Sequence, residues 1–240
     1  MMRLDKFLSE ASPYSRRESE KLIRRGAVTV NGETVSKPDA KVQETDEIRI
    51  NRRLVVYRKY IYLMLNKPQG YLSATEDKHD PVVIDLVPEE LRHFKVFPVG
   101  RLDKDTEGLL LLTNDGNFDH ALMSPKKQVT KRYFAILDKP AEPADAELFA
   151  AGMDLGDFTA KPGKLEISQD DQTHVFVEIS EGKFHQVKRM CEKAGKTVTF
   201  LKRIAIGSLQ LDETLSPGAC RELTPAELEI LGYSTAQNQK

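Results

Sequence analysis

Two aspartates, Asp103 and Asp105, stand in an unusually charged segment, residues 100–108, which directly precedes four consecutive leucines. Carboxylates at this spacing could bind calcium, because an EF-hand also places oxygen ligands at its first, third and fifth positions. The twelfth position would be Asn114 in place of a bidentate glutamate, and the flanks are typical of strands, so calcium is not favoured. Paired carboxylates also serve glycoside hydrolysis and two-metal nucleases, and acids in a turn can simply pair with neighbouring cations. Spacing alone leaves these alternatives open.

A second candidate segment, residues 180–190, is predicted to pass from a strand into a helix whose first N–H groups could face an anion. Lys188 falls near the edge of the apolar helix face and could point toward a site, whereas Arg189 falls on the outer side. His185 has no second histidine or cysteine at ligand spacing, so we interpret it as a residue that stabilises the turn or contacts RNA. Cys191 falls on the apolar face, which predicts a core residue and not a nucleophile.

The elements that must position these residues begin with a small N-terminal unit. Ser15 and Glu18 have the spacing of a capping box, and a helix is predicted from there to Gly26, which favours a C-terminal stop. A short strand over residues 27–30 and the Asn31-Gly32 dipeptide predict a hairpin. Residues 51–59 are polar enough to be predicted as a linker.

The remainder of the chain is predicted to be rich in strands. Residues 61–66 alternate as in a strand with two unlike faces, and residues 67–70 suit a β-turn. Further strands are predicted over residues 109–113, 133–137, 165–167 and 175–179, and helices over residues 144–153 and 186–194 and from Thr224 onward. Because helices interrupt the strands irregularly, the pattern indicates an α+β fold with a mostly antiparallel sheet.

Charge is distributed unevenly along the 240 residues, although the formal net charge is only −1. Residues 1–59 carry a net charge of +5 and residues 60–240 a net charge of −6. Two further basic clusters, Lys126 to Arg132 and Lys183 to Arg203, lie in the acidic remainder and could bind phosphates. The longest apolar run, residues 109–112, is far shorter than the roughly 20 residues of a membrane-spanning helix, and the N-terminus has no apolar signal stretch. With only two cysteines, a reducing cytoplasm is the expected location.

The charged segment and its neighbours resemble the motifs of one known family, the pseudouridine synthases of the small-subunit ribosomal RNA type. Residues 100–116 resemble the central motif of that family almost letter for letter, and three other segments resemble its remaining motifs in the expected order: residues 67–70, 131–133 and 181–190. Residues 1–59 are similar to the S4 RNA-binding domain that commonly precedes the catalytic domain, which would then span residues 60–240. In one respect the chain differs, because sister groups carry arginine where Lys188 stands, and lysine lacks the planar fork of arginine.

The resemblance implies an isomerase that detaches uracil from the sugar, turns it over and rejoins it through C5. Asp103 would be the catalytic carboxylate, Lys188 the cation beside it, and Tyr133 the residue that stacks on the base. Arg101 would fill the gap left by the flipped nucleotide. The reaction exchanges no electrons, so neither a cofactor nor a metal ion is expected.

The resemblance implies that the partner is ribosomal RNA or an assembly intermediate of the ribosome. The protein is expected to act as a monomer and to have no membrane partner. The residues expected to bind it, besides Arg101, are Arg3, Arg16, Arg17, Lys21, Arg24, Arg25, Lys67, His185, Gln186 and Arg189. The expected target is small-subunit (16S) RNA. A related enzyme acting on large-subunit (23S) RNA is the alternative within the family, and a non-catalytic RNA-binding assembly factor is the alternative outside it.

Overall fold

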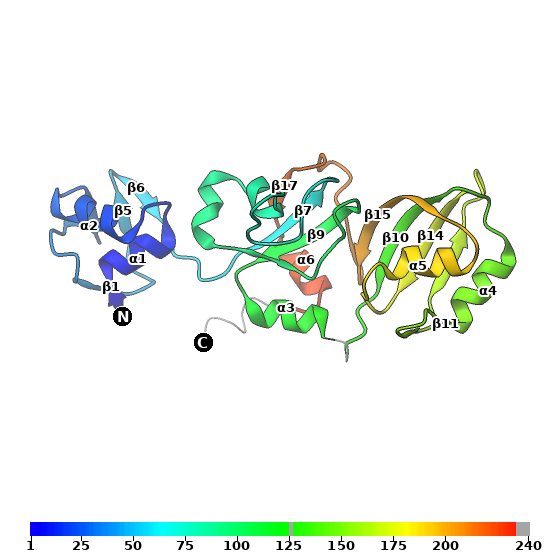
Figure 1. The fold of residues 1–240 in the computed structure, drawn as a ribbon. Helices are drawn as coiled ribbons and strands as arrows, with labels where there is room; N and C mark the ends of the chain where they lie inside the picture. Colours follow the sequence, from blue (N-terminus) through cyan, green and yellow to red (C-terminus); the bar gives the residue numbers. More distant parts are fainter. Residues whose placement is uncertain (125–126, 234–240) are drawn as a thin grey trace. The chain divides into compact units, whose positions relative to one another are not determined.

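The computed structural model describes residues 1–124 and 127–233, and the chain divides into two compact units (Figure 1). The first unit comprises Met1–Ile61 together with Val87–Val96, and the second comprises Tyr62–Leu86 and the chain from Phe97 onward. The segment Val87–Val96 contains the 3₁₀-helix η2 (Glu89–Phe94) and groups with the first unit. A division of the chain at residue 59 does not predict this grouping. No helix in the described ranges is long and apolar enough to cross a bilayer.

The first unit contains two helices and two small sheets. The helices are α1 (Leu4–Ala11) and α2 (Arg16–Arg24), and the strands are β1 (Met2–Arg3), β2 (Val28–Val30), β3 (Glu33–Thr34), β4 (Lys41–Val42), β5 (Ile48–Ile50) and β6 (Arg53–Val55). Strand β1 pairs with β4, and the other four form a sheet in the order β3-β2-β5-β6. The predicted capping box is confirmed, because Ser15 and Glu18 exchange hydrogen bonds at the start of α2. Both helices bury leucine, isoleucine or phenylalanine side chains in one core with the strands.

The prediction that residues 51–59 form a linker is wrong for Arg53–Val55, which pair with β5 as strand β6. The connecting turn consists of Asn51 and Arg52, whose φ angles are +48° and +70°. Two-residue hairpin turns with both central φ angles positive favour Asn followed by Gly. Because arginine occupies the second position, the usual sequence signal of this hairpin is missing.

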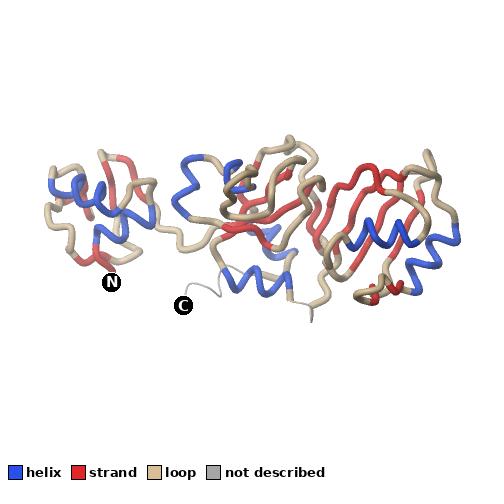
Figure 2. The backbone as a smooth tube through the Cα atoms, in the orientation of Figure 1, coloured by secondary structure: helices blue, strands red, loops and turns tan. Residues whose placement is uncertain are grey.

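The second unit is built on a nine-stranded sheet, and Figure 2 shows its strands in the interior with α4 and α5 at the surface. Its strands are β7 (Tyr62–Lys67), β8 (Phe97–Val99), β9 (Glu107–Thr113), β10 (Lys131–Leu137), β13 (Lys164–Ile167), β14 (His174–Ile179), β15 (Val198–Ile206), β16 (Leu209–Gln210) and β17 (Cys220–Glu222). Outside this sheet lie the hairpin β11 (Met153–Asp154) and β12 (Thr159–Ala160), the helices α3 (Gly116–Met123), α4 (Pro143–Ala151), α5 (Gln186–Lys193) and α6 (Pro225–Ile230), and the 3₁₀-helix η1 (Val83–Leu86).

The main path of the sheet runs β13-β14-β10-β15-β9-β7-β17. All of its pairings are antiparallel except β9 with β15, which is parallel. The predicted α+β class with a mostly antiparallel sheet is therefore confirmed. The hairpin of β13 and β14 and the helices α4, α5 and α6 also lie where the sequence predicts them.

Strand β7 differs from its prediction, because both of its faces are buried. Its polar side chains form hydrogen bonds inside the protein: the Tyr62 hydroxyl donates to Asp115 and the Asn66 amide donates to the carbonyl of Leu215. Asp115 also caps the unpredicted helix α3 by accepting from the backbone N–H of Asn117. The dipeptide Asp115-Gly116 therefore begins a helix in addition to ending a strand.

The parallel contact between β9 and β15 depends on Gly108. Its φ is +99°, and a Cβ atom built there would lie 2.2 Å from the backbone oxygen of Arg203. Only glycine combines this backbone conformation with so close an approach. Gly108 therefore fixes the end of the segment that carries Asp103 against strand β15.

Candidate active site

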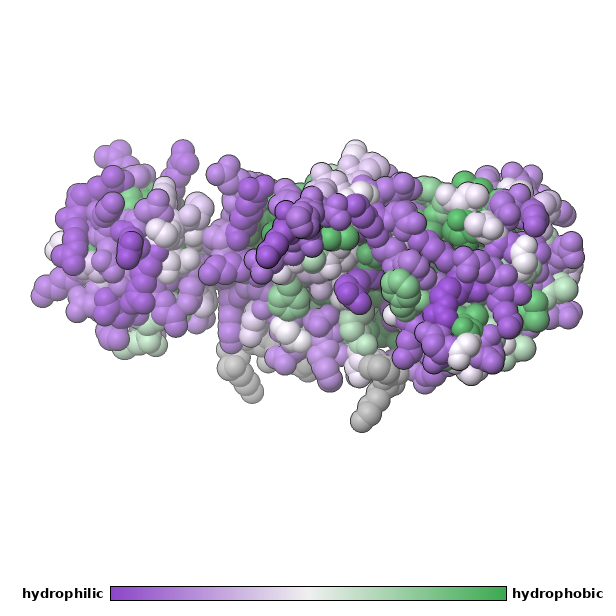
Figure 3. Space-filling model, viewed as in Figure 1, coloured by the Kyte–Doolittle hydropathy of each residue, from purple (hydrophilic) through white to green (hydrophobic). Residues whose placement is uncertain are grey.

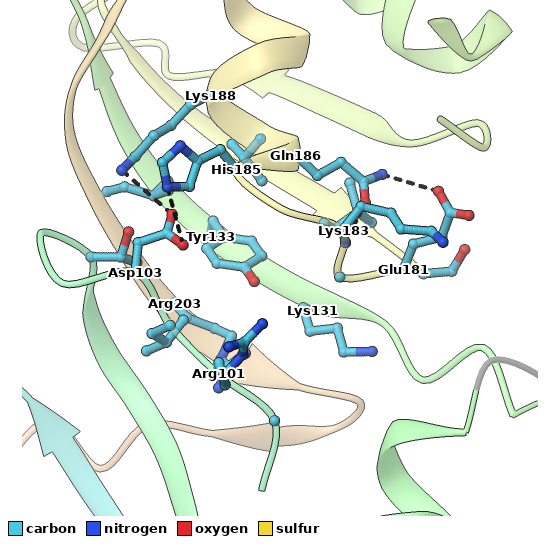
Figure 4. A pocket seen from close by; sticks show the side chains of 18 of the residues that line it. Arg101, Asp103, Lys131, Tyr133, Glu181, Lys183, His185, Gln186, Lys188 and Arg203 are labelled. Atoms are coloured by element: carbon cyan, nitrogen blue, oxygen red, sulfur yellow. Dashed lines mark hydrogen bonds and ion pairs between the residues drawn. The ribbon is translucent and has the colours of Figure 1, made fainter. Parts of the chain in front are cut away.

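A cavity of about 560 Å³ opens in the second unit, within the size range of small-ligand sites. Three structural regions line it, and Figure 4 shows their side chains around the ring of Tyr133. The loop before β9 contributes Arg101 and Asp103, the neighbouring strands β10 and β15 contribute Tyr133 and Arg203, and the segment from strand β14 into α5 contributes residues including His185 and Lys188. The structure thus brings the two sequence-predicted chemical segments to one cavity.

The Asp103 carboxylate lies at the wall of this cavity, and its side chain is 29% exposed. The Lys188 ammonium is 3.5 Å from Oδ2, and His185 Nε2 is 3.6 Å from Oδ1 (Figure 4). His185 caps α5 with φ of +49°, a left-handed conformation that is uncommon for a residue other than glycine. The predicted proximity of Lys188 to Asp103 is present in the structure.

Lys188 also holds Asp105, whose Oδ1 is only 2.6 Å from the ammonium nitrogen. Burial tends to raise the pKa of Asp105, but the hydrogen bond and charge of Lys188 outweigh it and hold that pKa below its ordinary value. One ammonium group therefore bridges both carboxylates of the charged loop. The side chain of Asp105 is 70% exposed, and of these two aspartates only Asp103 lines the cavity.

Lys67 does not lie where its prediction as an RNA contact requires, because it is completely buried. Its ammonium group donates to the backbone oxygens of Pro68, Asp103, Lys104 and Thr106, at 2.9 to 3.3 Å. Three of these oxygens belong to the loop that carries Asp103. The prediction of RNA binding is corrected here: Lys67 is a positioning residue that holds this loop in shape.

Two buried cations of the cavity, Lys131 and Arg203, are missing from the predicted site residues. Lys131 is two residues before Tyr133, and the burial of alternate residues along β10 places both on one face. Arg203 lies directly opposite Tyr133 on β15. The alternation along β10 could have identified Lys131, whereas no local pattern reveals that Arg203 is buried beside β9.

The turn before α5 holds two more predicted RNA contacts in intramolecular bonds. Gln186 is 3% exposed; its amide donates to Glu181 and accepts from the backbone N–H of Lys183. Arg189 donates to the backbone oxygen of Leu155 and pairs with Asp157. The structure therefore gives both residues positioning roles that the sequence does not predict.

An exposed aromatic residue, Phe184, stands beside the cavity and is also absent from the predictions. Its side chain is 72% exposed, and its ring stacks on that of His185 with 3.8 Å between centroids and 17° between planes. An isolated Phe in a sequence is expected to be buried. Sequence alone therefore carries no signal for this exposed ring pair.

The predicted basic residues of the first unit fall into two groups. Arg3 and Arg16 both pair with the buried carboxylate of Asp5, at 2.8 and 3.3 Å. The remaining four are exposed and make no ion pair with any residue between 1–124 or 127–233; they are Arg17, Lys21, Arg24 and Arg25. The visible surface of this unit is mostly hydrophilic, with a few smaller hydrophobic areas (Figure 3). Arg101 is exposed at the cavity, and Lys126 lies outside the described residues.

Two other kinds of chemistry find no support in the geometry. Within the described residues, no group of three or more His, Cys, Asp or Glu side chains is arranged to hold a metal ion, and the Lys188 ammonium lies against both carboxylates that a shared ion would need. Cys191 is buried on the apolar face of α5 as predicted, and burial raises the pKa of its thiol to about 12.

Comparison with known proteins matches both units. A family model described as RNA pseudouridylate synthase matches residues 61–193, and a model of the S4 domain matches residues 2–48. The chain is 46% identical over 244 residues to an uncharacterized RNA pseudouridine synthase of Bacillus subtilis, covering 98% of this chain and 100% of that relative. It is 40% identical over 233 residues to the ribosomal small subunit pseudouridine synthase A of Haemophilus influenzae, covering 96% and 99%. A crystal structure of a pseudouridylate synthase superposes with a TM-score of 0.68 at 39% identity and covers 96% of this chain and 100% of that one.

Proposed function

The chain belongs to the RNA pseudouridylate synthase family and carries an S4 domain at its N-terminus, and from that premise we propose that it converts one uridine of small-subunit ribosomal RNA into pseudouridine. The observation that carries the proposal is the Asp103 carboxylate at the cavity wall, held between Lys188 and His185. Relatives from Haemophilus influenzae and Yersinia pestis are named ribosomal small subunit pseudouridine synthase A, which favours small-subunit RNA as the substrate.

The proposed reaction breaks the bond between N1 and C1′, turns the uracil over and joins C5 to C1′. The proton on C5 is lost and N1 gains one, so atoms and electrons balance within one nucleotide. An ionised carboxylate can act on the sugar or base as a nucleophile or remove a proton as a base. The Lys188 ammonium lies 3.5 Å from Asp103 Oδ2, so its positive charge faces the carboxylate at the proposed reaction site.

Tyr133 and Arg101 are proposed to bind the flipped nucleotide and the gap it leaves. The Tyr133 ring lines the cavity and is 7% exposed, so one face can stack on the uracil. Arg101 is exposed where the cavity opens, in position to fill the vacated place in the RNA. Extruding a base costs about a few kcal/mol, which contacts of this kind offset.

RNA outside the cavity is proposed to contact two surfaces. The stacked pair of Phe184 and His185 offers an exposed ring to a neighbouring base. The exposed cations of α2 in the S4 domain suit the phosphate backbone of folded RNA. The proposal includes action as a monomer and a cytoplasmic location, and the two free cysteines agree with the latter.

The test is release of tritium from ribosomal RNA that carries 5-tritiated uridine, because the C5–H bond must break in the reaction. The intact protein should release tritium from small-subunit RNA, and Asp103→Asn should lower the rate by about 10³-fold or more while RNA binding persists. Asp105→Asn is the matched control and should keep most of the rate. Normal release by Asp103→Asn would refute the role of that carboxylate, and absence of release by the intact protein from small-subunit RNA would refute the proposed substrate.

A further inference from the structure

Two buried cations form the part of the cavity that the proposed reaction leaves without a role. Lys131 is 7% exposed and Arg203 is 3% exposed, and both line the cavity with Tyr133. In Figure 4 they are drawn with Arg101 below the Tyr133 ring, whereas Lys188 and His185 are drawn above it. The cavity thus has a second cationic region apart from the one that faces Asp103.

The two cations have almost no partners in the protein. Arg203 Nε donates to the backbone oxygen of Leu109 at 2.8 Å, but its Nη2 atom is buried without a hydrogen-bond partner. The ammonium group of Lys131 forms no hydrogen bond or ion pair with the residues that the structure describes. The residues that the structure describes therefore do not neutralise these two buried charges.

The carboxylates that line the cavity are already engaged elsewhere. Asp103 faces Lys188 and His185. Glu181 accepts from the Gln186 amide and from the backbone N–H of Lys161. Neither is paired with Lys131 or Arg203, so an anion must come from outside the described chain if the two charges are to be compensated.

Such an arrangement opposes folding. A buried charge without a partner loses its hydration and gains little in return. Burial lowers the pKa of Lys131, and the charge of Arg203 lowers it further. An unfavourable pair of charges inside a ligand cavity is typical of a site prepared for an anionic ligand.

We propose that Lys131 and Arg203 bind a phosphodiester group of the RNA backbone next to the target uridine. The inference rests on the proposed function and names a part of its substrate. Uracil is neutral and can accept hydrogen bonds, but it cannot compensate two positive charges. Each phosphodiester of RNA carries one negative charge and oxygen acceptors suited to arginine and lysine. With the base on the Asp103 side of Tyr133, the attached backbone is the nearest source of such a charge.

The experiment compares the binding of uridine 5′-monophosphate and uridine to the intact protein by calorimetry. The nucleotide should bind roughly ten- to a hundredfold more tightly than the nucleoside, as expected for a hydrogen-bonded charge pair. Lys131→Met removes the ammonium at similar length and should abolish that preference. Lys161→Met is the matched control, since Lys161 also lines the cavity but is exposed, and it should keep most of the preference.

Thermal unfolding separates a binding role from a structural one. Lys131→Met should melt at the same temperature as the unchanged protein or higher, because it removes an uncompensated buried charge. Loss of the preference together with a clearly lower melting temperature would contradict the proposal. So would equal binding of nucleotide and nucleoside by the unchanged protein, including no detectable binding of either, or a preference that survives in Lys131→Met.

The tritium-release assay on ribosomal RNA distinguishes failure of this inference from failure of the proposed function. Tritium release without a preference for the nucleotide would overturn the phosphate site alone. A preference for the nucleotide without tritium release would overturn the proposed function and leave the phosphate site in place.

Discussion

The cations of the S4 domain and those of the catalytic cavity are the same residue types in opposite surroundings. The cations of α2, here taken to include its C-cap residue Arg25, are exposed and unpaired within the described chain; they are Arg17, Lys21, Arg24 and Arg25. In the second unit, Lys67 is fully buried and fixed by backbone oxygens of the Asp103 loop. An exposed charge acts over distance and is screened by salt, whereas a buried charge acts on the few atoms it touches. Removing one buried cation should therefore harm the enzyme more than removing several exposed ones.

The largest effect is expected for Lys67→Met. The variant removes the ammonium donor from four carbonyl oxygens, of which those of Asp103 and Lys104 keep a backbone N–H donor. A buried oxygen that is left unsatisfied costs about 1–3 kcal/mol. We expect lower stability and a tritium-release rate reduced by about 10³-fold, because the loop that carries Asp103 loses its support. Lys104→Met is the control: Lys104 lies in the same loop, but its ammonium is exposed and pairs with Asp80. Equal reductions in both variants would contradict a special role for the buried lysine.

The pH dependence of the unchanged protein tests the same interaction without a substitution. Burial lowers the pKa of Lys67 to about 8, although Asp103, Asp105 and Glu107 oppose this shift and Lys188 adds to it. Activity should fall with a midpoint near pH 8 as the loop loses the ammonium. The unfolded chain keeps this proton up to about pH 10.5, so between these values it binds more protons than the folded state. In that pH window the contribution of Lys67 therefore makes the free energy of unfolding increase as the pH rises. Activity should consequently fall without a parallel fall in melting temperature.

Sequence patterns predicted the parts of this molecule that depend on neighbours along the chain. The capping box of α2, the helix from Thr224 onward and the strand over residues 133–137 follow local rules, and the structure contains all three. The role of Asp103 is predicted only through the motifs, whereas the helical pattern already indicates that Lys188 could point toward a site. The buried roles of Lys67 and Arg203 depend on strands that are distant in sequence. Lysine and arginine are expected at the surface, so nothing local to either residue could reveal its burial.

A smaller effect is expected for Lys188→Ala, which removes the cation shared by Asp103 and Asp105. The tritium-release rate should fall by about 10²-fold, because the Asp103 carboxylate loses the cation that pairs with it and holds it in place. Lys188→Arg keeps the charge and should recover most of the rate, despite the different shape of the guanidinium. Lys193→Ala, on the exposed side of the same helix, is the control.

The pH dependence of stability gives a second readout for Lys188. In the unchanged protein the pKa of Asp105 is held below its ordinary value of 3.8, despite its partial burial, by the hydrogen bond and charge of Lys188. A depressed carboxylate pKa contributes stability above the unfolded pKa, and that contribution is lost as pH falls through the folded pKa. The stability difference between the unchanged protein and Lys188→Ala should therefore be present at neutral pH and shrink below about pH 4. A difference that stays constant across this range would contradict the ion pair.

The smallest effect on the chemical step is expected when the four exposed cations of α2 are replaced together by glutamine. RNA affinity should fall by about tenfold near 0.1 M salt, and the slope of log K against log salt should decrease by about one for each phosphate that the variant no longer binds. With saturating RNA the tritium-release rate should stay within about twofold, because none of these residues lines the cavity.

The matched control for this variant replaces four other exposed cations of the same unit, Lys37, Lys41, Arg52 and Arg53. If both variants lose affinity equally, the S4 domain acts through its net charge; if only the first does, α2 forms the RNA-binding surface. A large fall in the tritium-release rate of the first variant at saturating RNA would contradict the distinction between exposed and buried cations. It would mean that the S4 surface also acts on the reacting nucleotide.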